Sequence, residues 1–171
     1  MARSQIAASR RHSVSILLTV VLCFGALFFW MQAASAVDDL NTYLPKVAPA
    51  DFFPEAVRFG TPQGNPAIVP ALKDDEVKGF VYLNSDFANA TGYSGKPIHL
   101  LVGITTKGVV TGFKMVEHKE PIVLLGIPEK RVVDAVNKLV GADMDRVARG
   151  TAPAPQVDIV SGATVTVLVM G

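Results

Sequence analysis

The sequence predicts an α+β domain with a mainly antiparallel sheet and packed helices, preceded by an export signal. Three observations lead to this fold class. Residues 98–105 carry apolar side chains at every second position and return after a short turn as residues 109–118, which is typical of a β-hairpin. Residues 128–140 carry apolar side chains at helical spacing. An apolar run occupies residues 14–31.

The N-terminus has the three parts of a secretory signal peptide. Arg3, Arg10 and Arg11 precede the 18-residue apolar run, and the small residues 34–36 (Ala-Ser-Ala) follow it. Eighteen residues also reach the lower limit for a membrane span, so an uncleaved anchor is the alternative. We therefore expect residues 1–36 to be a signal peptide or membrane anchor, and residues 37–171 to form an exported domain.

Charge and cysteine content exclude several functions. Three of the 16 basic residues and none of the 15 acidic ones lie in residues 1–36, so 13 and 15 remain and the exported part carries −2. Without a basic cluster, this part is not expected to bind nucleic acid. The only cysteine, Cys23, lies in the apolar run. The exported part therefore has no disulfide, thiolate metal site or cysteine nucleophile.

The exported part begins with mixed and β-rich segments. Residues 37–60 contain three prolines and are expected to form one or two short helices. The turn-forming residues 61–66 indicate a loop. Residues 67–72 and 77–83 are candidate strands, and residues 84–93 are polar enough for a loop or short helix.

The hairpin and the helix after it are the clearest elements. The hairpin has one predicted core face, made of Ile98, Leu100, Val102, Ile104, Phe113 and Met115. Residues 120–126 are expected to be a connector. A helix should begin near Pro128 and end at Gly141, with Val132, Val136, Leu139 and Val140 as its apolar stripe. Residues 151–156 contain two prolines and predict an extended loop.

Conventional catalytic and metal motifs are not present. His99 and His118 are the only histidines of the exported part, and neither has a second histidine at metal-ligand spacing. Ser161 lacks the Gly-x-Ser-x-Gly context of a nucleophile elbow, because Ile159 stands at the first glycine position. Glycine-rich nucleotide motifs are also missing. We therefore expect no metal site and no catalytic residues.

Residues 158–164 read Asp-Ile-Val-Ser-Gly-Ala-Thr. This pattern resembles the flavinylation motif of the FMN-binding domain in the sodium-pumping NADH:quinone oxidoreductase, the Rnf complex and the NosR/NirI proteins. Residues 92–98 and 117–126 are similar to two other segments of that domain. In the second, Glu120-Pro121 replaces the commoner Glu-Thr and is the form associated with NosR/NirI proteins. The resemblance covers residues 37–171.

The resemblance implies covalent FMN, attached through its phosphate to the hydroxyl of Thr164 by a periplasm-facing flavin transferase that splits FAD. Thr166 is the alternative acceptor. The recognition frame would be Asp158, Ser161, Gly162 and Ala163. As further neighbours of the flavin ring or phosphate we expect Tyr93, His118, Glu120 and Leu125.

The same resemblance implies a function in denitrification, on the periplasmic side of the bacterial inner membrane. The domain would carry electrons in support of nitrous oxide reductase, its maturation machinery and its expression, without a substrate of its own. Because residues 165–171 end the chain in an apolar run, we expect a longer membrane protein, with iron–sulfur clusters only in its remaining part. The alternatives are a flavin-binding sensory or assembly module, and a flavin subunit of an Rnf-like complex.

Overall fold

The computed structural model describes residues 40–88 and 90–170. The expected signal peptide or anchor, residues 1–36, lies outside the described residues. Within them, no helix has both the length and the apolar character needed to cross a membrane.

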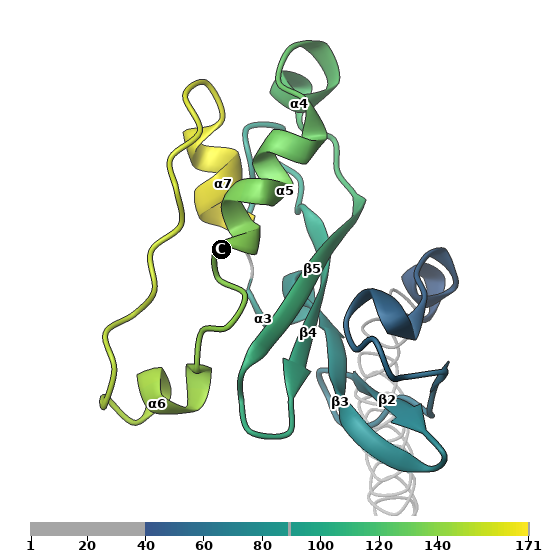
Figure 1. Ribbon diagram of the computed structural model, residues 1–171. Helices are drawn as coiled ribbons and strands as arrows, with labels where there is room; N and C mark the ends of the chain where they lie inside the picture. The colour runs from purple at the N-terminus through teal and green to yellow at the C-terminus, as the bar shows by residue number, and fades with distance from the viewer. Residues whose placement is uncertain (1–39, 89, 171) are drawn as a thin grey trace, which may run out of the picture. The chain divides into compact units, whose positions relative to one another are not determined.

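Five antiparallel strands form one sheet in chain order, as Figure 1 shows. They are β1 (Arg58–Phe59), β2 (Ile68–Lys73), β3 (Glu76–Leu83), β4 (His99–Thr105) and β5 (Val110–Glu117). The α+β fold class is therefore confirmed, together with the strands expected near residues 67–72 and 77–83 and the hairpin of β4 and β5.

The turns of the sheet follow local backbone preferences. Asp74 and Asp75, between β2 and β3, both have positive φ, at 48° and 67°. Positive φ at both central residues is the condition for a type I′ turn, whose twist matches that of the flanking strands. Between β4 and β5, Gly108 has a φ of 82°. Both hairpins are thus closed by residues that tolerate the left-handed region.

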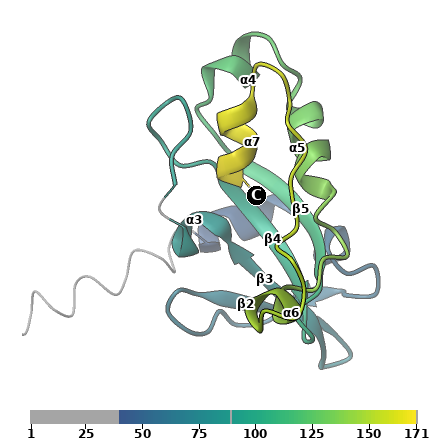
Figure 2. The same ribbon diagram turned by 90° about the vertical axis from the view of Figure 1, so that its left-hand side faces the viewer.

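Both faces of the sheet are covered, which differs from the half-buried strand expected for residues 98–105. One face packs Leu100 and Val102 against helices, and the other packs Leu101 against the N-terminal segment that contains Phe52 and Phe53. Figure 2 shows α5 and α7 side by side on the first face. Because residues 40–56 supply a second core, β4 is apolar on both sides.

The helices are short. Residues 40–43 are helical and lead into two 3-10 turns, Leu44–Lys46 and Pro49–Asp51, which agrees with the short helices expected in residues 37–60. The others are α3 (Asn84–Phe87), α4 (Pro121–Leu125), α5 (Glu129–Asn137), α6 (Met144–Ala148) and α7 (Thr164–Met170).

Three helices refine the sequence expectations. The expected connector at residues 120–126 contains α4. In and after α5, Val132, Val136 and Leu139 are buried as expected, but Val140 is 44% exposed, because α5 ends at Asn137, before the Gly141 expected from the sequence. Helix α6 was not expected, although its first turn has a local cause, since the Asp143 side chain accepts a hydrogen bond from the amide of Arg146.

Candidate functional site

The residues 160–163 form a tight turn that leads into α7. The amide of Ala163 donates to the carbonyl of Val160 at 2.8 Å, and Gly162, the third residue of the turn, has a φ of 86°. A positive φ at this position is typical of a type II turn and favours glycine. A Cβ at Gly162 would also lie 3.1 Å from Cδ1 of Ile127. The glycine therefore permits both the turn and close approach to the chain between α4 and α5.

The two threonines of α7 have different surroundings. Thr164 is the first residue of the helix, is half-buried, and forms no side-chain hydrogen bond with any residue from 40–88 or 90–170. Thr166 is fully buried, and its Oγ1 donates to Oε2 of Glu120 at 2.6 Å. Of the two threonine hydroxyls of α7, that of Thr164 is thus the one without a hydrogen-bond partner among the described residues.

The remaining motif residues hold the segment in place. Asp158 forms an ion pair with Lys138, just after α5, and both side chains are more than half exposed. An exposed pair of this kind stabilises little, but it ties the motif segment to α5. Ala163 is fully buried, whereas Ser161 is exposed.

Glu120 connects three segments that are distant in the sequence. Its carboxylate is completely buried and accepts hydrogen bonds from the amide of Tyr93 (3.1 Å), the amide of Ser94 (3.1 Å) and the hydroxyl of Thr166 (2.6 Å). Burial opposes ionisation, but the hydrogen bonds from Thr166, Ser94 and Tyr93 outweigh it and lower the pKa of Glu120. The carboxylate is therefore a buried anion at neutral pH.

The loop at residues 92–95 fits closely around this carboxylate. A Cβ at Gly92 would lie 2.3 Å from Oε1 and 2.6 Å from Oε2 of Glu120. No side chain larger than hydrogen fits there while the carboxylate stays in place. The glycine is thus required by the close approach of the backbone to Glu120.

Three further residues expected at the site lie in the same region. Nδ1 of His118 accepts from the amide of Glu120 at 3.2 Å, and its Nε2 lies 3.9 Å from Oε2 of Glu129. Tyr93 is 53% exposed and Leu125, on α4, is 88% exposed. Figure 2 shows α4 near the beginning of α7. Through Glu120 the fold therefore joins the loop of Tyr93, the start of α4 and α7, whereas Asp158 lies beside Lys138, after α5.

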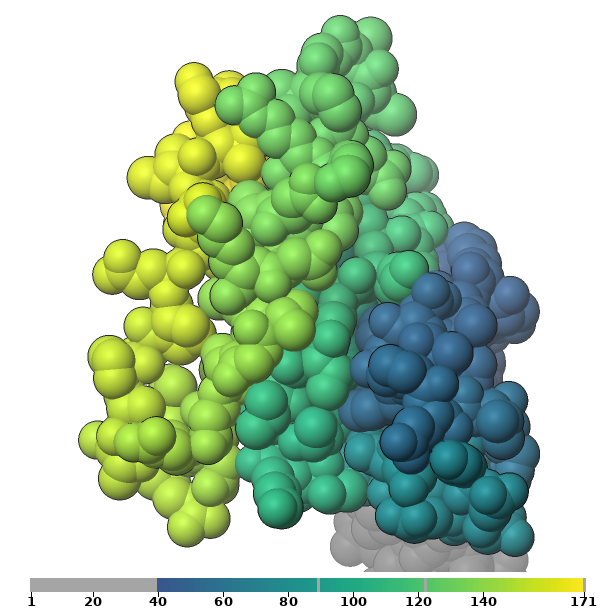
Figure 3. Space-filling view, viewed as in Figure 1, coloured from purple at the N-terminus to yellow at the C-terminus, as the bar shows by residue number. Residues whose placement is uncertain are grey.

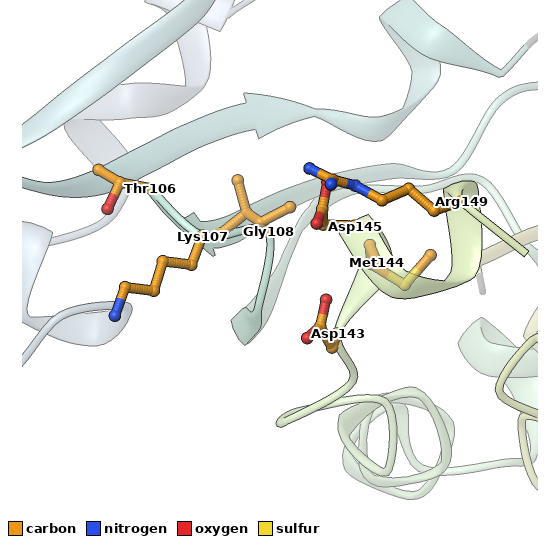
Figure 4. Close-up of a pocket in the computed structure, with 8 residues that line it drawn as sticks. Thr106, Lys107, Gly108, Asp143, Met144, Asp145 and Arg149 are labelled. Carbon is orange, nitrogen blue, oxygen red and sulfur yellow. The ribbon is translucent and has the colours of Figure 1, made fainter. Parts of the chain in front are cut away.

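A separate cleft lies at the other end of the β4–β5 hairpin. Its volume is about 710 Å³, and its walls are the hairpin turn, with Lys107 and Gly108, and α6 with the residue before it. In the space-filling view the chain around α6 lies beside the hairpin (Figure 3), and the amide of Met144 donates to the carbonyl of Gly108 at 2.9 Å. Figure 4 shows Asp145 beside Arg149, whose Nε donates to it at 3.0 Å. None of the site residues expected from the sequence lines this cleft.

Metal-ligand clusters were also sought in the described part of the chain. It contains no group of three or more His, Cys, Asp or Glu side chains that could hold a metal ion. The segments joined through Glu120 offer the Thr164 hydroxyl, a buried carboxylate and exposed apolar side chains.

Sequence reasoning did not anticipate two contacts of this site. The Thr166–Glu120 hydrogen bond joins residues 46 positions apart, and the Lys138–Asp158 ion pair joins residues 20 apart. The only feature of the local sequence that indicated the Thr166–Glu120 contact was that Glu120 stands at the start of an apolar segment. Its partners could not be inferred without the fold.

Comparison with known proteins identifies the domain. The FMN-binding domain family matches residues 92–170, which include Gly92, Glu120 and the whole of residues 158–164. The regulatory protein NosR of Pseudomonas aeruginosa is 37% identical over 131 residues, 74% of this chain and 18% of that protein.

Two further relatives agree. NosR of Stutzerimonas stutzeri is 39% identical over 123 residues, 70% of this chain and 17% of that protein. The protein NirI of Paracoccus denitrificans is 34% identical over 94 residues, 55% of this chain and 14% of that protein. The chain thus spans less than a fifth of the length of these relatives. It is an FMN-binding domain of the NosR/NirI family.

Proposed function

We propose that this chain is an exported electron-transfer domain that carries FMN covalently on Thr164. The observation that supports this most directly is the difference between the two threonines of α7. The hydroxyl of Thr164 is half-buried and has no partner among the described residues, whereas that of Thr166 is buried and bonded to Glu120. The acceptor that the motif implies is therefore the one that is free to react.

The surrounding residues fit a tethered flavin. A flavin ring is large and apolar, and apolar side chains left in solvent can cover it. Leu124 and Leu125 of α4 are 67% and 88% exposed, and Tyr93 is 53% exposed. We assign Tyr93, Leu125 and His118 to the ring or phosphate surroundings, and Asp158, Ser161, Gly162 and Ala163 to recognition by the transferase.

Attachment is a phosphoryl transfer at the Thr164 oxygen. This oxygen attacks the phosphorus on the FMN side of FAD, the hydroxyl loses its proton, and AMP is the leaving group. Once bound, the isoalloxazine supplies the redox chemistry. The residues of the chain position the tether, and the covalent bond keeps the flavin at high effective concentration outside the cytoplasm.

In the whole protein, we propose that residues 1–36 direct export or anchor the chain and that residues 37–171 form its domain on the periplasmic side of the bacterial inner membrane. Its partners would be the flavin transferase, and nitrous oxide reductase or its maturation machinery. Iron–sulfur clusters would lie in the part of the protein beyond this chain.

Intact mass tests the attachment. The chain would be produced with a periplasmic flavin transferase, beside Thr164→Val and Thr166→Val. We expect the wild type and Thr166→Val to gain the mass of one FMN less one water, and Thr164→Val to gain nothing. An unmodified wild type, with the transferase shown to be active on another acceptor, would contradict the proposal, as would a modified Thr164→Val.

A sensory or assembly module is the second candidate, favoured by the word "regulatory" in the names of both NosR relatives. The two functions differ in turnover. If the flavin carries electrons, its reduction and reoxidation will keep pace with nitrous oxide reduction when an electron donor is supplied. A flavin that stays in one redox state during turnover would favour the sensory function.

A further inference from the structure

Glu120 is a buried negative charge without a cationic partner. Its carboxylate has no exposed surface, and no Lys, Arg or His side chain of the described residues forms an ion pair with it. Two backbone amides and one hydroxyl compensate the charge instead. A buried anion held only by neutral donors is costly to bury, and its field is weakly screened by solvent.

This charge lies beside the helix that carries the attachment site. The Glu120 carboxylate contacts Thr166, and Thr164 is two residues earlier on α7, about 5–6 Å away between Cα atoms in a regular helix and on another side of it. The same carboxylate holds the loop of Tyr93. The anion therefore touches two of the segments assigned to the flavin site.

We propose that the negative charge of Glu120 holds the reduction potential of the flavin at a low value. This inference rests on the proposed attachment of FMN to Thr164. Reduction adds electrons to the ring, and a fixed negative charge nearby in a medium of low polarity disfavours added negative charge. Both oxygens of Glu120 are occupied by donors of its own chain, so its effect on the flavin is through space.

A purely structural role makes a different prediction. If Glu120 only held the loop and α7 together, removal of any of its hydrogen bonds would shift the midpoint potential of the flavin in the same direction. If the charge of Glu120 sets the potential, removing this charge and removing a hydrogen-bond donor to it shift the midpoint potential in opposite directions. The Thr166 hydroxyl dipole partly neutralises the carboxylate, so its loss leaves a stronger negative field.

The experiment is a spectroelectrochemical titration of the flavinylated chain at fixed pH, with the attachment of FMN confirmed by mass for each variant. We expect Glu120→Gln to shift the midpoint potential to a more positive value. Glu120→Asp, which keeps the charge, should stay close to the wild type. Thr166→Val should shift it to a more negative value.

The outcomes separate the possibilities. An unchanged or more negative potential in Glu120→Gln would overturn the inference, as would equal shifts of the same sign in all three variants. If Glu120→Gln does not fold, Thr166→Val decides alone, since an unchanged or more positive potential contradicts the charge effect. A wild type that carries no FMN would instead contradict the proposed function.

Discussion

At the scale of single residues, two glycines determine how closely the segments of the site approach each other. Gly92 leaves room for the Glu120 carboxylate, and Gly162 adopts the positive φ of the turn before α7. The two positions require glycine for different reasons. At Gly92 there is no space for a Cβ, and at Gly162 the backbone has a positive φ. The motif glycine therefore has a structural role, which is independent of recognition by the transferase.

Replacing Gly162 by alanine should lower the free energy of unfolding by more than the same change at Gly150. Both residues have positive φ (86° and 69°), which costs an alanine about 1–2 kcal/mol. Only at Gly162 would the Cβ also meet another side chain, 3.1 Å away on Ile127, whereas Gly150 has open space. Urea unfolding of both variants measures the difference, and equal losses would show that the Ile127 contact is relieved without cost.

At the scale of elements, β4 is the strand that separates the two cores. Leu100 is fully buried on the α5 and α7 side, and Leu101 is fully buried against the N-terminal segment. Neither core is complete without this strand. Substitutions at the two neighbouring leucines therefore report on opposite sides of the sheet.

Leu100→Ala and Leu101→Ala should each lower the free energy of unfolding by about 2–5 kcal/mol, because each leaves a cavity in a packed core. A strand with one solvent-facing side would instead tolerate Leu101→Ala with little loss. Chemical denaturation of the two variants is the measurement. A loss well below 1 kcal/mol for Leu101→Ala would show that residues 40–56 do not cover this face in solution.

Local sequence patterns predicted the elements whose cause is local. The alternation in residues 98–105, the turn at Gly108 and the stripe of α5 were sufficient to locate the hairpin and helix. The burial of Leu101 was not predictable from alternation, since it depends on a segment some 50 residues earlier. In the same way, the motif implied Thr164 as the acceptor with Thr166 as the alternative, but the different surroundings of the two hydroxyls depend on the contact of Thr166 with Glu120, which the sequence did not predict.

At the scale of the whole molecule, the buried carboxylate links stability to pH. The pKa of Glu120 is below its ordinary value of 4.5 in the folded protein, because the hydrogen bonds from Thr166, Ser94 and Tyr93 outweigh burial. A lowered carboxyl pKa contributes stability above the unfolded-state value, and this contribution is lost as pH falls toward the folded-state value. Protonation of Glu120 in acid should therefore lower the free energy of unfolding of the domain.

Between neutral pH and pH 4.5 the contribution of Glu120 should be nearly constant, and below pH 4.5 the wild type should lose stability more steeply than Glu120→Gln. The glutamine cannot titrate, so it removes this part of the pH dependence while other carboxyls keep theirs. Thermal unfolding of both proteins across this range is the measurement. Parallel curves below pH 4.5 would contradict the lowered pKa.

The chain-order pairing of the sheet also has a consequence for the order of folding. Each strand pairs only with its neighbours along the chain, so β1 to β5 can assemble as successive hairpins, which favours rapid folding. Helix α7 is the last element described, and its bond to Glu120 must close a 46-residue separation. We therefore expect α7 to dock after the sheet and to open before it, so that amide hydrogens of α7 exchange faster than those of β4. An enzyme that modifies this helix would then meet a segment that can open while the rest of the domain stays folded.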